Sequence, residues 1–152
     1  MSNDDLIDTL NDLIETSKDG EYGFHHASEH AETPDLKQTF LSRAEDCRRG
    51  AIELQGLVAR LGGKPEDSGT VIGAAHRGWA SAKGALTGYT ALSLLEETER
   101  GEDVAMDRYR KALGADDLPT DVRAVIERQF EGVKRNHAQI RSLRDQARHA
   151  HA

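Results

Sequence analysis

Apolar residues recur along four stretches of the chain at alternating steps of three and four positions, which places their side chains on one face of an α-helix. This spacing predicts helices over residues 4–31, 36–61, 89–113 and 119–147. In the second stretch the pattern is close to a heptad repeat and carries Phe40, Ala44, Cys47, Ala51, Leu54, Val58 and Leu61. The sequence therefore predicts an all-α protein, with residues 1–152 forming a single domain.

The connections between the predicted helices are short, long and short. Thr33-Pro34 separates the first helix from the second, because a proline disfavours helical geometry in the residue before it. Gly114 and Pro119 separate the third helix from the fourth. Between the second and third helices lies a crossover of about 25 residues, 64–88, which carries a short amphipathic helix around Trp79. One long crossover makes the third helix run parallel to the second, as in ferritin-like four-helix bundles.

Glutamates occupy positions of the predicted inner faces where apolar residues are expected. Glu99 and Glu102 continue the apolar seam of the third helix, and Glu21 interrupts that of the first. A buried carboxylate costs several kcal/mol unless it is neutralised, paired or bound to a metal. Because all helices rise equally per residue, Glu45 and Glu131 fall at about the same level. Every helix therefore brings a carboxylate to one layer.

The chain resembles the ferritin-like superfamily over about residues 5–147, and this resemblance indicates where metal ligands would stand. Di-iron members use one inward Glu from each of two helices and a Glu-x-x-His from each of the other two. Glu21 of the first helix and Glu99 or Glu102 of the third match the positions of the two single inward glutamates. The histidine positions that follow Glu45 and Glu131 hold Arg48 and Lys134, which have no lone pair to offer a metal. The resemblance thus implies a bundle with a degraded di-iron motif.

A narrower resemblance rests on five segments, SKDGEYGF, ARLGGKP, AAHRGWASAKGALTG, ETERGEDVAMDRYRKAL and VKRNHAQIRSLRD. Together they are similar to a bacterial ferritin-like four-helix-bundle family that is classed as a domain of unknown function. This resemblance implies the fold and brings no activity, substrate or catalytic residue with it.

Two hypotheses account for the inward glutamates. In the first, which we favour, side-chain cations pair with them and the protein holds no cofactor. The candidate cations are Arg48, Arg49, Lys134 and Arg77. In the second, iron or manganese is bound by a carboxylate-rich set of ligands. The set is Glu21, Glu99, Glu102 and His137, with Glu45, Glu96 and Glu131 as second choices.

The remaining chemistry-bearing residues have simpler interpretations. His26 and His30 stand one turn apart in the run HHASEH, at a spacing that can chelate a divalent metal, although solvated helix surface is the simpler interpretation. Cys47 lies among small apolar residues and is expected to behave as one of them. Trp79 either anchors the crossover on the bundle or marks a subunit interface.

Charge and composition exclude several classes of function. A net charge of −7 disfavours nucleic-acid binding, which needs a basic face. No apolar run approaches the roughly 18 residues of a membrane-spanning helix. The single cysteine and the absence of a secretory signal favour a cytoplasmic location. No nucleotide-binding or hydrolase motif is present, so a non-catalytic role is favoured over an enzyme.

We therefore expect a non-catalytic binding or stress-associated protein that forms a homo-oligomer, in the simplest case a dimer. One alternative is a metal-dependent oxidase or peroxidase that uses the carboxylates together with His137. A second alternative is a scaffold that binds another protein through the crossover segment.

Overall fold

The computed structural model describes residues 1–69 and 88–150. These residues form four α-helices and no strand: α1 (Asn3–His30), α2 (Pro34–Arg60), α4 (Ala91–Leu113) and α5 (Thr120–Ala150). The all-α class is thus confirmed, and each helix begins and ends within three residues of the position expected from the sequence. The short helix expected around Trp79 lies outside the described residues. None of the described helices is long and apolar enough to cross a membrane.

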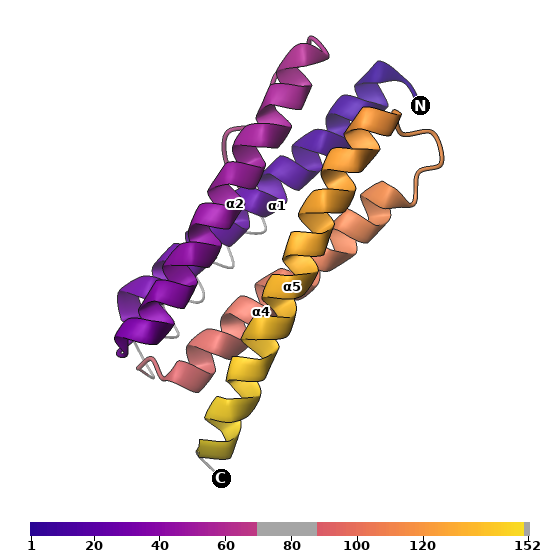
Figure 1. Cartoon of the computed structure of the whole chain (residues 1–152). Helices are drawn as coiled ribbons and strands as arrows, with labels where there is room; N and C mark the ends of the chain where they lie inside the picture. The colour runs from indigo at the N-terminus through magenta and orange to yellow at the C-terminus, as the bar shows by residue number, and fades with distance from the viewer. Residues whose placement is uncertain (70–87, 151–152) are drawn as a thin grey trace.

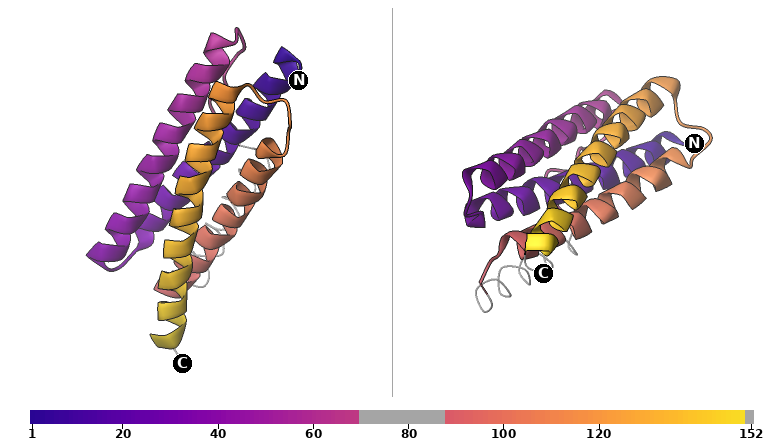
Figure 2. Two further views of the ribbon diagram at one scale, coloured as in Figure 1. Left: turned by 45° about the vertical axis from the view of Figure 1, so that its right-hand side comes forward. Right: turned by 60° about the horizontal axis from the view of Figure 1, so that its bottom comes forward.

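The helices form two antiparallel pairs that pack side by side (Figure 1). α1 packs along α2, α4 packs along α5, and α1 also contacts α4. α2 ends at one end of the bundle and α4 begins at the other, so these two helices run parallel (Figure 1). This is the predicted ferritin-like order with one long crossover. The contact between α2 and α5 is sparse by comparison. Figure 2 shows the four helices from two further sides.

Polar side chains fix where three of the helices begin. The Ser2 hydroxyl accepts a hydrogen bond from the Asp5 backbone N–H, and the Thr33 hydroxyl accepts one from Leu36. Thr90 and Ser93 form a reciprocal capping box at the start of α4. Such caps satisfy backbone donors that have no partner within the helix, and each stabilises its helix by about 1 kcal/mol.

Two apolar clusters make up the core, one toward each end of the bundle. The first contains Leu10, Leu13, Ile14, Leu54, Val58 and Ile126, all fully buried. The second is built around Phe24, Phe40, Leu95 and Ile140. Burying each large side chain contributes roughly 1.5–3 kcal/mol, so these clusters hold the four helices together. The stretches of helix between the two clusters carry the polar inward positions, and these form the middle layer of the bundle.

Candidate functional site

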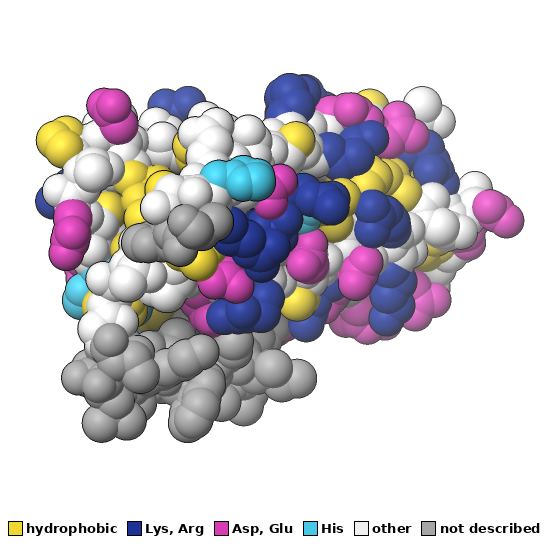
Figure 3. Space-filling model, turned by 90° about the horizontal axis from the view of Figure 1, so that it is seen from below, with side chains coloured by type: hydrophobic (Ala, Val, Ile, Leu, Met, Phe, Trp, Pro, Cys, Tyr) yellow, Lys and Arg dark blue, Asp and Glu magenta, His cyan; other side chains and the backbone are white. Residues whose placement is uncertain are grey.

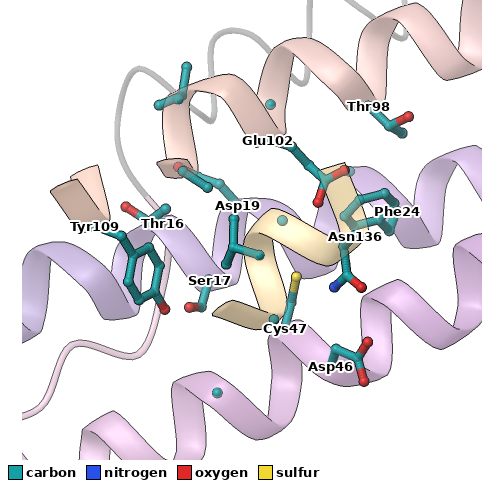
Figure 4. Close-up of a pocket in the computed structure, with 18 of the residues that line it drawn as sticks. Thr16, Ser17, Asp19, Phe24, Asp46, Cys47, Thr98, Glu102, Tyr109 and Asn136 are labelled. Atoms are coloured by element: carbon teal, nitrogen blue, oxygen red, sulfur yellow. The ribbon is translucent and has the colours of Figure 1, made fainter. Parts of the chain in front are cut away.

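A cavity of about 1070 Å³ occupies the middle layer, and all four helices contribute to its wall (Figure 4). Its lining includes a set of glycines, Gly20, Gly23, Gly50, Gly101 and Gly132. Because glycine has no side chain, some of these positions leave open space: a Cβ added at Gly23 or Gly101 would meet nothing within 4 Å. Phe24 and Val133 add apolar surface to the wall.

Glu102 lies in the wall of this cavity without a hydrogen-bond partner on one of its oxygens. Only 6% of the residue is exposed, and its Oε1 is buried and unpaired. Burial raises the pKa of the Glu102 carboxyl from 4.5 to about 8; Arg43 opposes the rise, while Asp103 and Glu99 add to it. At neutral pH the Glu102 carboxyl is therefore mostly protonated and uncharged.

Glu99, one turn before Glu102, has a cation beside it. Arg144 of α5 donates a hydrogen bond from Nη1 to Oε1 of Glu99, and both side chains are nearly buried. Arg144 also contacts Asp145 at 2.9 Å. The carboxylates of Asp145 and Glu99 together raise the pKa of the Arg144 guanidinium. The middle layer thus contains a charge-paired glutamate next to a neutral one.

Three of the cations expected to neutralise the buried glutamates, Arg48, Arg49 and Lys134, pair with surface carboxylates instead, and the fourth, Arg77, lies outside the described residues. Arg48 contacts Glu45 at 2.6 Å and Arg49 contacts it at 3.2 Å. The Arg48 hydrogen bond in particular lowers the pKa of Glu45 to about 2. Lys134 contacts Glu131 at 2.7 Å. The reason is local, because residues three or four positions apart on one helix face each other.

The other predicted ligands lie outside the cavity wall. Glu21 is half-buried beside Lys18, and Glu96 contacts Arg148 at 3.4 Å. Nε2 of His137 lies 2.6 Å from Oδ1 of Asp103. Only Glu102 of the predicted ligands lines the cavity among the residues described. Basic and acidic side chains are intermingled over the face seen in Figure 3, in keeping with these surface pairs.

Arg144 was missed by reasoning from sequence, although it occupies a detectable position. It follows Ile140 by one helical turn and so continues the inward face of α5. If α4 and α5 fold back about residue 116, the equal rise of the two helices predicts that Glu99 lies level with Lys134. The observed pairs, Asp103 with His137 and Glu99 with Arg144, show that α5 is shifted by several residues from the expected register.

The residues of the middle layer do not fit a two-metal centre. Across residues 1–69 and 88–150, no group of three or more His, Cys, Asp or Glu side chains is arranged to hold a metal ion. Glu99 is already paired with Arg144, while Glu21, Glu96 and His137 contact Lys18, Arg148 and Asp103. Metal ligands must be deprotonated and free to coordinate. As they are arranged in this structure, the described residues do not bring a di-iron set of donors together.

The histidine run of α1 contacts Tyr89, which lies just before the start of α4. The rings of His30 and Tyr89 stack at 3.9 Å, and the Tyr89 hydroxyl lies 3.3 Å from Nε2 of His26. Burial and the neighbouring His30 lower the pKa of His26. His25 is exposed and contacts Glu29 at 3.1 Å. These rings join the two helices at one end of the bundle.

The fold and the helix order define a ferritin-like four-helix bundle. Residues 5–115 match the family described as a domain of unknown function, DUF2383. This match covers well over half of the chain, and the chain belongs to that family. The comparison with curated proteins finds no match.

Three solved structures share the fold at low sequence identity. The first is a dodecameric thioferritin, the bacterioferritin-related protein from Bacteroides fragilis, with 17% identity, a TM-score of 0.77 and coverage of 99% of this chain and 91% of that one. A point mutant of Dps1 from Mycobacterium smegmatis is 16% identical, with a TM-score of 0.75 and coverage of 95% and 99%. A ferritin-like, diiron-carboxylate protein from Bacillus anthracis is 19% identical, with a TM-score of 0.75 and coverage of 95% and 99%.

Proposed function

We propose that this chain is a non-catalytic binding protein in which side-chain charge, rather than a metal, compensates the buried glutamates of a ferritin-like bundle. The observation that carries the proposal is the nearly buried Arg144–Glu99 pair. An arginine guanidinium always carries its charge and binds a carboxylate through fixed donors, so it can take the electrostatic place of a cation. The cavity beside this pair is the binding site that we propose.

A metal-dependent oxidase or peroxidase is the second candidate. The unpaired Oε1 of Glu102 favours it, because a buried oxygen facing a cavity is also where a metal would be held. The diiron-carboxylate relative from Bacillus anthracis makes iron the first metal to test. Under this candidate the ligands would be those predicted from the sequence, Glu21, Glu99, Glu102 and His137.

Metal content separates the two candidates. Untagged protein from iron- and manganese-supplemented cells is analysed by inductively coupled plasma mass spectrometry, together with the Glu99→Ala and Glu102→Ala variants. We expect well under one metal ion per chain in all three preparations. One or two equivalents of iron or manganese that disappear in a variant would overturn the charge-compensated proposal and establish the metal site.

We also propose that the chain forms a homo-oligomer. The relative from Bacteroides fragilis is dodecameric, which supports self-association in this fold. Ile52 of α2 is 51% exposed, and a second copy could cover this apolar side chain. A dimer is the simplest assembly consistent with these features.

A further inference from the structure

Side chains join α2 to α5 at two places, and the packing of these two helices is otherwise sparse. Nη2 of Arg128 donates a hydrogen bond to Oε2 of Glu53 at one place. Nη1 of Arg43 donates a hydrogen bond to Oε1 of Gln139 at the other, at 2.6 Å. About three turns of each helix lie between these two links. We call this stretch the α2–α5 window.

The cavity reaches solvent through the α2–α5 window. Asp46 and Arg49 of α2 lie within the window and line the cavity, and so do Gly132 and Arg135 of α5. The side chain of Arg49 is 72% exposed and that of Asp46 is 46% exposed. Because exposed side chains form this part of the wall, a ligand could enter between the two helices.

Arg135 lies on the side of α5 that faces α2. The steps from Arg128 to Gly132, Arg135 and Gln139 are four, three and four residues. Such steps keep side chains on one face of a helix, and both end members contact α2. A Cβ added at Gly132 would lie 3.7 Å from Nη2 of Arg135. The guanidinium therefore folds back over this glycine, at the wall of the cavity.

Arg135 differs from the other arginines of the cavity wall because it has no partner. The others pair with carboxylates: Arg49 with Glu45, Arg100 with Glu97, Arg108 with Asp12, and Arg128 with Glu53. Arg135 makes no hydrogen bond or ion pair with any described residue. Asp46, the carboxylate of the window, contacts Arg43 at 3.1 Å. The window thus presents a positive charge that no carboxylate of the described chain compensates.

Behind the window, the wall of the cavity is mostly apolar (Figure 4). Phe24 and Tyr109 are 4% and 3% exposed, and Val133 adds further apolar surface. The hydroxyls of Thr16 and Thr98 donate to carbonyls of their own helices at 2.9 and 3.0 Å, and the Tyr109 hydroxyl is also hydrogen-bonded within the protein. Such a surface suits a hydrocarbon chain, which needs no hydrogen bonds.

We propose that the cavity binds an amphipathic anion of the fatty-acid type, whose carboxylate pairs with Arg135 in the α2–α5 window and whose hydrocarbon chain lies inside. This inference names the ligand class of the proposed binding function and rests on it. A guanidinium always carries its charge and presents parallel N–H donors that match a carboxylate. The cavity volume, about 1070 Å³, is ample for a long chain, and mostly apolar walls with few polar groups are typical of such sites.

A cationic amphiphile is the main alternative ligand, and Glu102 is the group that would attract it. Oε1 of Glu102 is buried without a partner, but this residue belongs to α4, whereas the window lies between α2 and α5. The carboxylates of Glu53, Glu97 and Asp103, which also line the cavity, already contact arginine or histidine side chains. A cation in the window would be repelled by Arg135. Pairing at Arg135 requires no particular protonation state of Glu102.

The test is a fluorescence titration with cis-parinaric acid, a long-chain polyene fatty acid whose emission rises in an apolar environment. Its methyl ester has the same chain without the charge. Below the critical micelle concentration, wild-type protein is expected to bind the acid saturably, with one molecule per chain. The ester should bind about tenfold more weakly, because it cannot form the charge-assisted pair with Arg135.

Variants of Arg135 identify the group that holds the carboxylate. Arg135→Gln should weaken binding of the acid about tenfold and leave binding of the ester unchanged. Arg135→Lys keeps the charge and should retain most of the affinity. Arg141→Gln is the matched control, because it removes an exposed arginine of α5 that does not line the cavity. Both positions are exposed, so these variants should fold as wild type does.

Gly132→Leu tests whether the hydrocarbon chain enters through the window. The new side chain enters the wall at a point where an added Cβ meets only Nη2 of Arg135. It should weaken binding of the acid and of the ester alike, by about tenfold. Gly56→Leu is the control: the same substitution at an exposed glycine of α2 that does not line the cavity, with nothing within 4 Å of an added Cβ.

Four results would overturn the inference. Equal affinity of wild-type protein for acid and ester, or unchanged binding of the acid by Arg135→Gln, would show that Arg135 holds no carboxylate. Equal binding by Gly132→Leu and Gly56→Leu would place the probe outside the cavity. Stronger displacement of the probe by dodecyltrimethylammonium than by dodecanoate would assign the site to cations.

The metal analysis distinguishes failure of this inference from failure of the proposed function. Iron or manganese that disappears in Glu102→Ala would overturn the proposed function itself. Metal-free protein that binds neither the acid nor the ester would overturn only the ligand class.

Discussion

Glu102 carries a carboxyl group whose protonation is controlled by the helices around it. On an exposed helix face the same side chain would be ionised at neutral pH, but burial raises its pKa to about 8. The folded chain therefore holds a proton between pH 4.5 and about pH 8 that the unfolded chain releases. Because the folded state binds more protons in this range, the free energy of unfolding falls as the pH rises.

Glu102→Gln should remove this dependence. From pH 5 to pH 8 the variant should become progressively more stable than wild type. The difference in their free energies of unfolding should change by roughly 1 kcal/mol per pH unit, which amounts to about 3 kcal/mol over this range. Urea denaturation of both proteins at several pH values measures it. Glu127→Gln, at a side chain that is 57% exposed, serves as the control and should show no such trend. A constant difference across the range would contradict the raised pKa.

The Glu99–Arg144 pair acts at the scale of helices, because it joins α4 to α5 within the middle layer. Arg144→Met should lower the melting temperature by several degrees, since it leaves Glu99 without its cation in a nearly buried position. Glu99→Gln combined with Arg144→Met should recover most of the loss, because no unpaired charge remains. Differential scanning calorimetry of the single and double variants measures the interaction between Glu99 and Arg144.

Arg148→Met provides the comparison on the same helix. Arg148 contacts Glu96 at 3.4 Å, but 51% of its side chain is exposed, so solvent screens that pair. A melting temperature for Arg148→Met as low as that for Arg144→Met would show that the buried pair has no special role.

The close approach of α1 and α2 depends on a glycine beside a cysteine. A Cβ added at Gly20 would lie 2.8 Å from Sγ of Cys47, and the short cysteine side chain has little freedom to move away. In Gly20→Ala, overpacking should therefore lower the free energy of unfolding by about 1–3 kcal/mol. The higher helix propensity of alanine offsets about 1 kcal/mol of this loss.

The sign should reverse when the sulfur is removed. In a Cys47→Ala background, Gly20→Ala keeps only the propensity gain and should stabilise the protein, which urea denaturation of the four proteins in this cycle can measure. Additive effects of the two substitutions would contradict the contact between Gly20 and Cys47.

At the scale of the whole molecule, the chain has the size and topology of a ferritin-like subunit. Under the proposed self-association, sedimentation velocity at micromolar concentration should show a species of two or more chains, in which a second copy covers apolar side chains such as Ile52. A net charge of −7 should make the association weaker at low salt, where repulsion between like-charged copies is less screened. A monomer at all concentrations and salt levels would contradict the proposed self-association.

The sequence by itself determined the helices, their order and the parallel run of α2 and α4. Each of these depends on local periodicity, on proline and glycine signals and on the length of the crossover, all of which are written along the chain. The sequence also identified Glu99 and Glu102 as inward positions, and both are buried.

Only the tertiary structure decided which partner each glutamate has. Arg48, Arg49 and Lys134 form ion pairs with carboxylates on their own helices. The cation beside Glu99 is Arg144, because α5 is displaced from the register expected from the sequence. The proton on Glu102 and the glycine-lined cavity likewise depend on how four helices approach one another. Burial and side-chain pairing across helices are properties of packing, and no single stretch of sequence contains them.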